Sequence, residues 1–156
     1  EAIRGELTIS DLATKHQLGV GRIEHLLNRY GALALEVLAL IAERPDLAEP
    51  LKGAEDYLRV EVVYGVTHEG ALHLDDLMAR RTHISIETFH RGTEVAEEVA
   101  ALMAKELRWS RKHRALEVEH YLKRVEAELE SQTMPDDETA DAARMGAPDV
   151  VPIDRA

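Results

Sequence analysis

The chain has 156 residues, 45% of them hydrophobic, which suffices for one domain with a core of its own. It contains no cysteine, which excludes disulfide bonds, thiolate zinc sites and a cysteine nucleophile and agrees with a reducing compartment. With 30 acidic and 19 basic residues the formal charge is −11, so the field of the whole chain repels a nucleic-acid backbone.

Two short helices are predicted at the beginning of the chain. Thr8 and Asp11 form a capping box in front of a helix that ends near Gly19. Apolar residues then recur at helical spacing over residues 20–31, and the glycine at the end of this range suits a helix terminus. The sequence therefore predicts a helical pair before residue 32.

The middle of the chain contains one clear helix and one ambiguous segment. Residues 32–43 are apolar almost all round, which predicts a helix that is buried on several sides. Pro45 and Pro50 bracket the loop that follows. In residues 57–66 apolar and charged residues first alternate, as in a strand, whereas the length and the acidic start favour a helix. The residues alone leave the two alternatives about even.

Three more helices and a tail are predicted in the second half. Residues 74–81 form a short helix with acidic residues at its start and arginines at its end, as the helix dipole prefers. Residues 82–92 lack a helical period and are predicted to cross in an extended form. Thr93 and Ser110 can cap the last two helices. After Gln132 the segment is rich in proline and aspartate, which predicts a disordered tail.

The region around Gly19 suggests two functions, but its sequence context argues against both. Residues 19–21 begin like a dinucleotide-binding loop, but Glu24 replaces the third glycine and a predicted helix precedes them where a strand is required. Residues 8–31 also resemble a helix-turn-helix, with Arg22 and Arg29 on its second helix. That helix uses an apolar face for packing and the surrounding charge is negative, so a structural helical hairpin is favoured.

Charged residues between 68 and 82 form the densest polar segment. His68, Glu69, His73 and Asp76 suggest a metal site, but the zinc-protease pattern places two histidines four positions apart, and these are five apart. We expect no metal and instead a charged surface with interdomain contacts. The Arg80-Arg81-Thr82 run is either a solvated helix end or holds one half-buried arginine that binds carboxylates or carbonyls.

Several segments, taken together, resemble one known domain: HLLNRYG (25–31), AEPL (48–51), EVVYGVTHEGA (61–71), LDDLMARRT (74–82) and EVEHYLKRVEAE (117–128). Their order and spacing are similar to the C-terminal domain of bacterial FAD-dependent (aerobic) glycerol-3-phosphate dehydrogenases and of the related alpha-glycerophosphate oxidases. The resemblance covers roughly residues 22–131. Its most specific part is E-x-x-Y-x-V-x-x-E-x-A (61–71) followed by L-x-D-L-x-x-R-R-T (74–82).

The resemblance implies a function for a larger protein. The complete enzyme is expected to oxidise sn-glycerol 3-phosphate to dihydroxyacetone phosphate with FAD, which passes electrons to quinone or, in the oxidases, to oxygen. Flavin and substrate are expected in a preceding N-terminal FAD-binding domain, so this chain receives no catalytic, cofactor-binding or metal-binding residue and is expected to be inactive alone. The resemblance also implies a helix over residues 57–66, although Gly65 stands where the family usually has alanine.

The predicted fold is all-α: a compact helical C-terminal cap domain of about six helices with a disordered acidic tail. Residues 1–21 form a helical lead-in, residues 22–131 the domain and residues 132–156 the tail. Seven residues are expected to fix the core of the domain or to dock it on the flavin domain: Glu61, Tyr64, Glu69, Asp76, Arg80, Arg81 and Thr82.

The alternative function is a free-standing helical interaction module or a helix-turn-helix DNA-binding module built on residues 8–31. A contiguous basic face on residues 20–30 would favour it. The chain begins with Glu1 and contains no run of about 18 apolar residues, so we expect a trimmed soluble chain without signal peptide or membrane span. We expect a cytoplasmic location, with the full-length enzyme peripheral to the inner face of the cell membrane.

Overall fold

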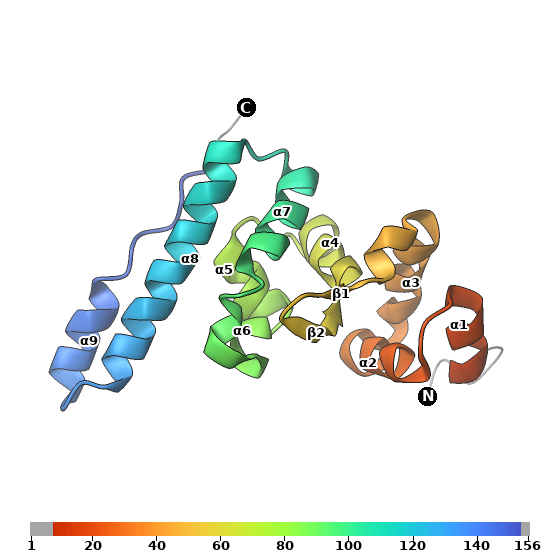
Figure 1. Ribbon diagram of the computed structural model, residues 1–156, viewed down its shortest axis with the longest axis horizontal. Coiled ribbons are helices and arrows are strands. Elements are labelled where there is room, and N and C mark those ends of the chain that lie inside the picture. Colours follow the sequence, from red (N-terminus) through yellow and green to blue (C-terminus); the bar gives the residue numbers. More distant parts are fainter. Residues whose placement is uncertain (1–7, 154–156) are drawn as a thin grey trace.

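The computed structural model describes residues 8–153, and its elements are almost all helical. Within these residues the sheet is a single antiparallel hairpin, so the predicted all-α class is confirmed apart from two short strands. Figure 1 shows the first three α-helices at one end of the molecule, helices α4 to α7 in the middle and the long pair α8 and α9 at the other end.

The N-terminal lobe consists of three helices and a 3-10 turn: α1 (Ile9–His16), α2 (Val20–Tyr30), η1 (Gly31–Leu33) and α3 (Ala34–Glu43). The predicted capping box is confirmed, because the backbone N–H of Asp11 donates to Thr8 Oγ1 (3.1 Å) and that of Thr8 donates to Asp11 Oδ2 (2.9 Å). Helix α1 ends earlier than predicted, at His16, because Gln17 adopts a left-handed conformation with φ of 54°.

The stretch Val20–Glu43 is long and apolar enough, by length and composition alone, to cross a membrane. This is weak evidence, since core helices of soluble proteins pass the same test. In the structure the chain changes direction inside this stretch, at Gly31, whose φ of 56° is in the left-handed region that suits glycine. Ile23 and Leu38, one on each side of that turn, are buried in the same core.

The ambiguous segment divides between a strand and a helix. After η2 (Pro45–Ala48), strand β1 (Pro50–Leu51) pairs antiparallel with β2 (Ala54–Leu58), and α4 (Arg59–Thr67) begins directly after it. The helix that the family resemblance implied is therefore confirmed from Arg59 onward and wrong for the two residues before it. The Glu61 carboxylate accepts the Leu58 N–H (2.9 Å), which fixes the point where strand becomes helix.

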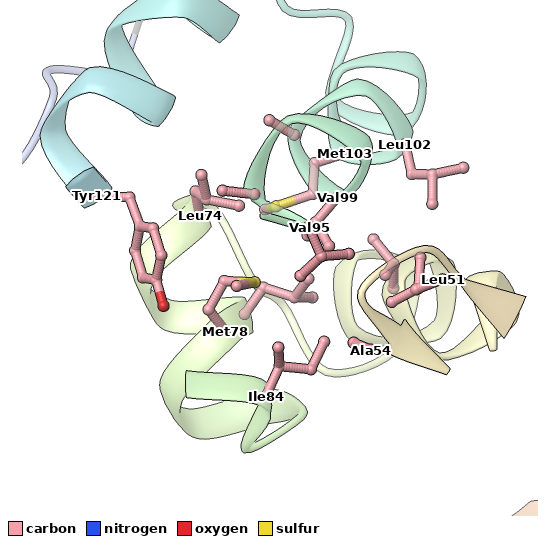
Figure 2. Close-up of a cluster of buried hydrophobic side chains, with 14 of the residues drawn as sticks. Leu51, Ala54, Leu74, Met78, Ile84, Val95, Val99, Leu102, Met103 and Tyr121 are labelled. Carbon is pink, nitrogen blue, oxygen red and sulfur yellow. The ribbon is translucent and has the colours of Figure 1, made fainter. Parts of the chain in front are cut away.

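Helix α4 lies between two hydrophobic clusters. Val60, Val63 and Tyr64 pack with the N-terminal lobe, whereas Val62 and Val66 pack with the central cluster. Figure 2 shows the central cluster, in which Leu74, Met78 and Ile84 meet Val95, Val99 and Met103. Because α4 is buried on both sides, its sequence lacks the one-sided apolar period of a surface helix.

The predicted helix over residues 74–81 is confirmed and ends in a wider turn. It comprises α5 (Leu74–Asp76) and the π-helical turn η3 (Leu77–Arg81), and Thr82 closes this turn by donating from its N–H and its hydroxyl to Leu77 O (2.9 and 2.8 Å). A Cβ atom on Gly65 would lie 2.7 Å from Leu77 Cδ1. The glycine at this position therefore lets η3 approach α4 closely.

Two predictions for residues 82–110 are wrong and one is confirmed. Instead of an extended crossing the chain forms α6 (Ile84–Glu87) and η4 (Phe89–Gly92), two turns too short to produce a helical period. Helix α7 (Ala96–Leu107) begins at Ala96 without a side-chain cap, so Thr93 is not its cap. Ser110 does cap α8 (Arg111–Gln132), because its hydroxyl accepts the His113 N–H (3.0 Å).

The segment after Gln132, predicted to be disordered, contains the helix α9 (Asp137–Met145). Asp136 caps it by accepting the Thr139 N–H (2.8 Å), and the helix lies along α8 (Figure 1). Ala140 and Val151 are buried. The average composition of the tail concealed these local features, a capping residue and a small residue that allows close packing of two helices.

Candidate functional site

A polar cleft lies where α2, the end of η3 and α6 approach one another. Of the seven residues singled out from the sequence, Glu69, Arg80 and Arg81 line it. The complete lining is His25, Asn28, Arg29, Tyr30, Glu69, Arg80, Arg81, His83 and Glu87. The fold thus brings residues from three distant segments to one surface.

Glu61 is fully buried beneath this cleft and is surrounded by donors. Besides the Leu58 N–H, its carboxylate contacts His25 Nε2 (3.0 Å) and accepts from the Tyr30 hydroxyl (3.3 Å). Arg29 Nε lies 3.6 Å from it and forms an ion pair. A carboxylate removed from water requires such partners, so Glu61 joins α2 to the start of α4.

Arg29 links α2 to the η3 turn. Its Nη2 donates to the Arg81 carbonyl oxygen (2.5 Å), and its guanidinium lies over the rings of Tyr57 (5.4 Å) and Tyr30 (5.7 Å). Burial opposes the charge of Arg29, but Tyr30, Tyr57 and Glu61 outweigh it and raise the pKa of the guanidinium above its usual value. Arg29 therefore stays charged while it holds the backbone of η3.

Two tyrosines under the cleft stay protonated to unusually high pH. Burial, reinforced by the charge of Glu61, raises the pKa of the Tyr30 hydroxyl. Burial and a hydrogen bond to Glu87 raise the pKa of Tyr57 in the same way. Both phenols therefore act as donors to carboxylates, and their rings provide the aromatic bed on which Arg29 lies.

Asp76 lies between the two arginines of the charged run. Its carboxylate pairs with Arg80 Nη1 (3.4 Å) and with Arg81 Nε (3.3 Å). The Arg80 side chain is 71% exposed, as expected for a solvated helix end. The Arg81 side chain is 38% exposed and binds a carboxylate, as expected for a half-buried arginine. Glu69, on the same cleft, has a buried Oε2 without a hydrogen-bond partner among the described residues.

Two of the predicted residues face the interior of the domain. The Tyr64 hydroxyl donates to Glu36 Oε2 on α3 (3.2 Å), and its ring stacks on His68 at 4.5 Å. Thr82 is fully buried and closes η3. Their geometry fits a role in the core of the domain; contact of any of the seven residues with another domain stays a prediction.

A second buried carboxylate, Glu117 on α8, was not recognised in the sequence. It contacts His73 Nδ1 (2.8 Å), accepts the Leu74 N–H (2.9 Å) and lies 3.4 Å from His113 Nε2. Glu117 belongs to the EVEHYLKRVEAE segment, but 43 residues separate it from Leu74. No local spacing reveals such a pairing, because only the packing of α8 against α5 produces it.

The histidines considered as metal ligands have separate partners. His68 Nδ1 forms a hydrogen bond with Thr67 Oγ1 (2.7 Å), and His73 faces Glu117. Among residues 8–153 no three histidine or carboxylate side chains come together in a way that would hold a metal ion.

The second helix of the supposed helix-turn-helix does not carry a contiguous basic face. Arg29 turns inward to Glu61, and the exposed Glu24 follows Arg22 closely. Helix α1 also precedes Gly19, where a dinucleotide-binding loop requires a strand. The geometry of this region is that of a packed helical pair.

Comparison with known proteins identifies the family. The sequence model described as the C-terminal domain of alpha-glycerophosphate oxidase matches residues 4–114. A glycerol-3-phosphate dehydrogenase of Mycobacterium leprae is 53% identical over 128 residues, and glycerol-3-phosphate dehydrogenase 2 of Mycobacterium tuberculosis is 49% identical over 128. Each of these alignments covers 82% of this chain and 22% of the relative, so the chain spans about one fifth of their length. No solved structure matches.

Proposed function

The chain belongs to the family of the C-terminal domain of alpha-glycerophosphate oxidase, and we propose that it is the C-terminal part of a larger FAD-dependent glycerol-3-phosphate dehydrogenase. The proposed reaction of the complete enzyme is oxidation of sn-glycerol 3-phosphate to dihydroxyacetone phosphate. One observation carries this proposal: the 53% identity over 128 residues with a protein named glycerol-3-phosphate dehydrogenase.

We place the flavin and the substrate in the preceding part of the polypeptide. Dinucleotide-binding folds use a parallel sheet with a glycine-rich turn at the end of a strand. The described residues contain one antiparallel hairpin, and Gly19 follows a helix, so they do not fit an FAD site. The proposed role of this domain is to stabilise the enzyme and to pack against the flavin domain.

The cleft supplies the part of the surface best suited to that packing. Arg29, Tyr30 and Glu61 hold its floor rigid, while the exposed Arg80 and the partly exposed Arg81 remain as polar groups that a neighbouring domain can engage. A preorganised floor with polar groups at its rim suits a docking surface.

The electron acceptor and the location belong to the same proposal. The proposed acceptor is a quinone, with oxygen as the alternative that the oxidase branch of the family uses. If the acceptor is a quinone, which is dissolved in the membrane, the complete enzyme would lie at the inner face of the cell membrane.

The proposal is tested by purifying this chain and the full-length gene product in parallel. We expect the full-length protein to be yellow and to reduce a dye when glycerol 3-phosphate is added, and this chain to be colourless and inactive. Stoichiometric FAD on this chain after gel filtration would contradict the assignment of the flavin to the upstream part. A full-length protein that leaves glycerol 3-phosphate unchanged would contradict the substrate.

A further inference from the structure

The segment between η3 and α7 presents two large apolar side chains to solvent. Ile86 on α6 is 72% exposed, and Phe89, the one phenylalanine of the sequence, is 94% exposed. Residues of these types are usually buried, and a single exposed one needs no explanation. Two exposed apolar side chains three positions apart, beside an apolar groove, do require an explanation.

The groove lies between η4 and α8. His90, which follows Phe89, forms part of its wall, and Leu122, Val125 and Leu129 of α8 form its apolar part. Leu122 and Leu129 are themselves partly exposed. We call Ile86, Phe89, Leu122 and Leu129 together the apolar face.

The backbone that carries Phe89 is held firmly. His90 and Arg91 adopt left-handed conformations with φ of 48° and 54°, which are uncommon for residues with side chains. The Tyr121 hydroxyl donates to the Arg91 carbonyl oxygen, and the Arg91 guanidinium pairs with Glu128 at 2.8 Å. Strained residues persist where the surrounding structure enforces them, and they concentrate at binding sites.

The charges around the apolar face limit what can bind there. Two carboxylates, Glu126 and Glu130, lie on the groove. These carboxylates repel an anionic membrane surface and favour an apolar protein segment with lysine or arginine at its edges.

We infer that the apolar face is covered by the preceding part of the same polypeptide, which inserts apolar side chains into the groove and basic ones along its acidic edge. This inference rests on the proposed function. The chain corresponds to 22% of the length of its relatives and to a C-terminal domain, so most of such an enzyme is covalently attached before it. Attachment keeps that part at a high effective concentration beside the exposed face.

Photo-crosslinking in the full-length protein tests the inference. A benzoyl-phenylalanine placed at position 89 is irradiated in the purified enzyme, and the joined peptides are identified by mass spectrometry. Met145 on α9, 86% exposed, provides the matched control position. We expect position 89 to link to a peptide upstream of Glu1 in the same polypeptide and position 145 not to do so. We also expect Phe89→Ser to lower the thermal midpoint of the full-length protein and Met145→Ser to leave it unchanged.

Three results would overturn the inference: links from position 89 to a second copy, links to lipid when membranes are present, or no link at all with an unchanged midpoint in Phe89→Ser. The unmodified full-length protein is first assayed for flavin and for oxidation of glycerol 3-phosphate. If both are absent, the proposed function fails, whatever position 89 contacts. If both are present and no upstream peptide is linked, only the docking inference fails.

Discussion

Two buried carboxylates, Glu61 and Glu117, perform related tasks in two parts of the molecule. Each contacts a histidine and accepts a backbone N–H at the beginning of a helix. The N–H that Glu61 accepts lies three residues before it, whereas the one that Glu117 accepts belongs to Leu74 on another element. Both carboxylates thus join two helices, and Glu61 in addition shapes the start of its own helix.

The two sites differ in their positive charge. Glu61 has an arginine at 3.6 Å, and the buried Tyr30 donates to it as well. Glu117 has histidines instead, at 2.8 and 3.4 Å. An arginine keeps its charge at every accessible pH, so removal of Glu61 leaves a buried cation behind, while histidine can remain neutral. The penalty for losing the carboxylate should therefore be larger at Glu61.

Glu61→Ala is expected to have the largest effect on stability. Loss of this carboxylate leaves Arg29, His25 and the Leu58 N–H without their acceptor, and breaking a buried ion pair costs about 3–5 kcal/mol. Denaturant unfolding of this chain measures the change. Glu61→Gln removes the charge but keeps the size of the side chain and an acceptor oxygen, so it should cost less. Equal losses in the two variants would show that the charge alone accounts for the effect.

Glu117→Ala should follow, with a loss of about 2–3 kcal/mol, because one buried N–H and a histidine lose their partner but no arginine does. The matched control is Glu119→Ala on the same helix, whose exposed carboxylate pairs with Lys123 and should contribute little to stability. If Glu117→Ala destabilised the chain more than Glu61→Ala, the distinction drawn between the two sites would be wrong.

Alkaline pH should weaken both regions through their tyrosines. Burial raises the pKa of Tyr30 near Glu61 and of Tyr121 near Glu117, so their stabilising contribution is complete below the unfolded pKa of about 10 and is lost as pH rises above it. At pH 11 each tyrosine should cost about 1 kcal/mol relative to pH 9. Urea unfolding of Tyr30→Phe and Tyr121→Phe at both pH values measures this.

Each phenylalanine variant should lose less stability than the original chain between pH 9 and pH 11. The charge of Glu61 is the second cause of the raised Tyr30 pKa, whereas Asp75 and Glu128 act on Tyr121. Because burial is the first cause for both phenols, the alkaline losses due to Tyr30 and Tyr121 should both persist in a Glu61→Gln background. If the Tyr30 contribution disappeared in this background, the charge of Glu61 and not burial would be what keeps the phenol neutral.

The sequence predicts features that depend on neighbouring residues. The Thr8–Asp11 box, the Ser110 cap and the helix over residues 74–81 are confirmed, because capping and helix charge act within one turn. Glu61 was also selected, through the family segment that contains it. Other partners of the two carboxylates, Tyr30 for Glu61 and His73 and Leu74 for Glu117, lie 31 to 44 residues away in the sequence, which no local period encodes.

The incorrect predictions also concern structure that depends on contacts with distant parts of the chain. Residues 82–92 fold into two short turns in which three of the four left-handed positions, His83, His90 and Arg91, have side chains, so only Gly92 is the usual marker of such a conformation. Helix α9 has few apolar residues and depends on α8 for its packing. In both cases tertiary contacts stabilise a structure that local composition argues against.

Arg80 and Arg81 provide the smallest expected effects and connect the Glu61 region to the proposed neighbour. In this chain Arg80→Ala should change stability by under about 1 kcal/mol, because its 71% exposed side chain forms only a weak pair with Asp76. Arg81→Ala should be nearly as mild, since Arg29 holds the backbone oxygen of Arg81 and the substitution keeps that oxygen.

In the full-length protein the effects of Arg80→Ala and Arg81→Ala should diverge. The half-buried Arg81 is the one whose guanidinium is already fixed at the cleft rim, and a docked domain would bury it. The measurement is thermal unfolding and flavin retention of both variants in both contexts. If both variants behave alike in the full-length protein, Arg81 is not buried by the neighbouring domain; if Arg81→Ala unfolds this chain alone, its side chain serves the core through Asp76 instead.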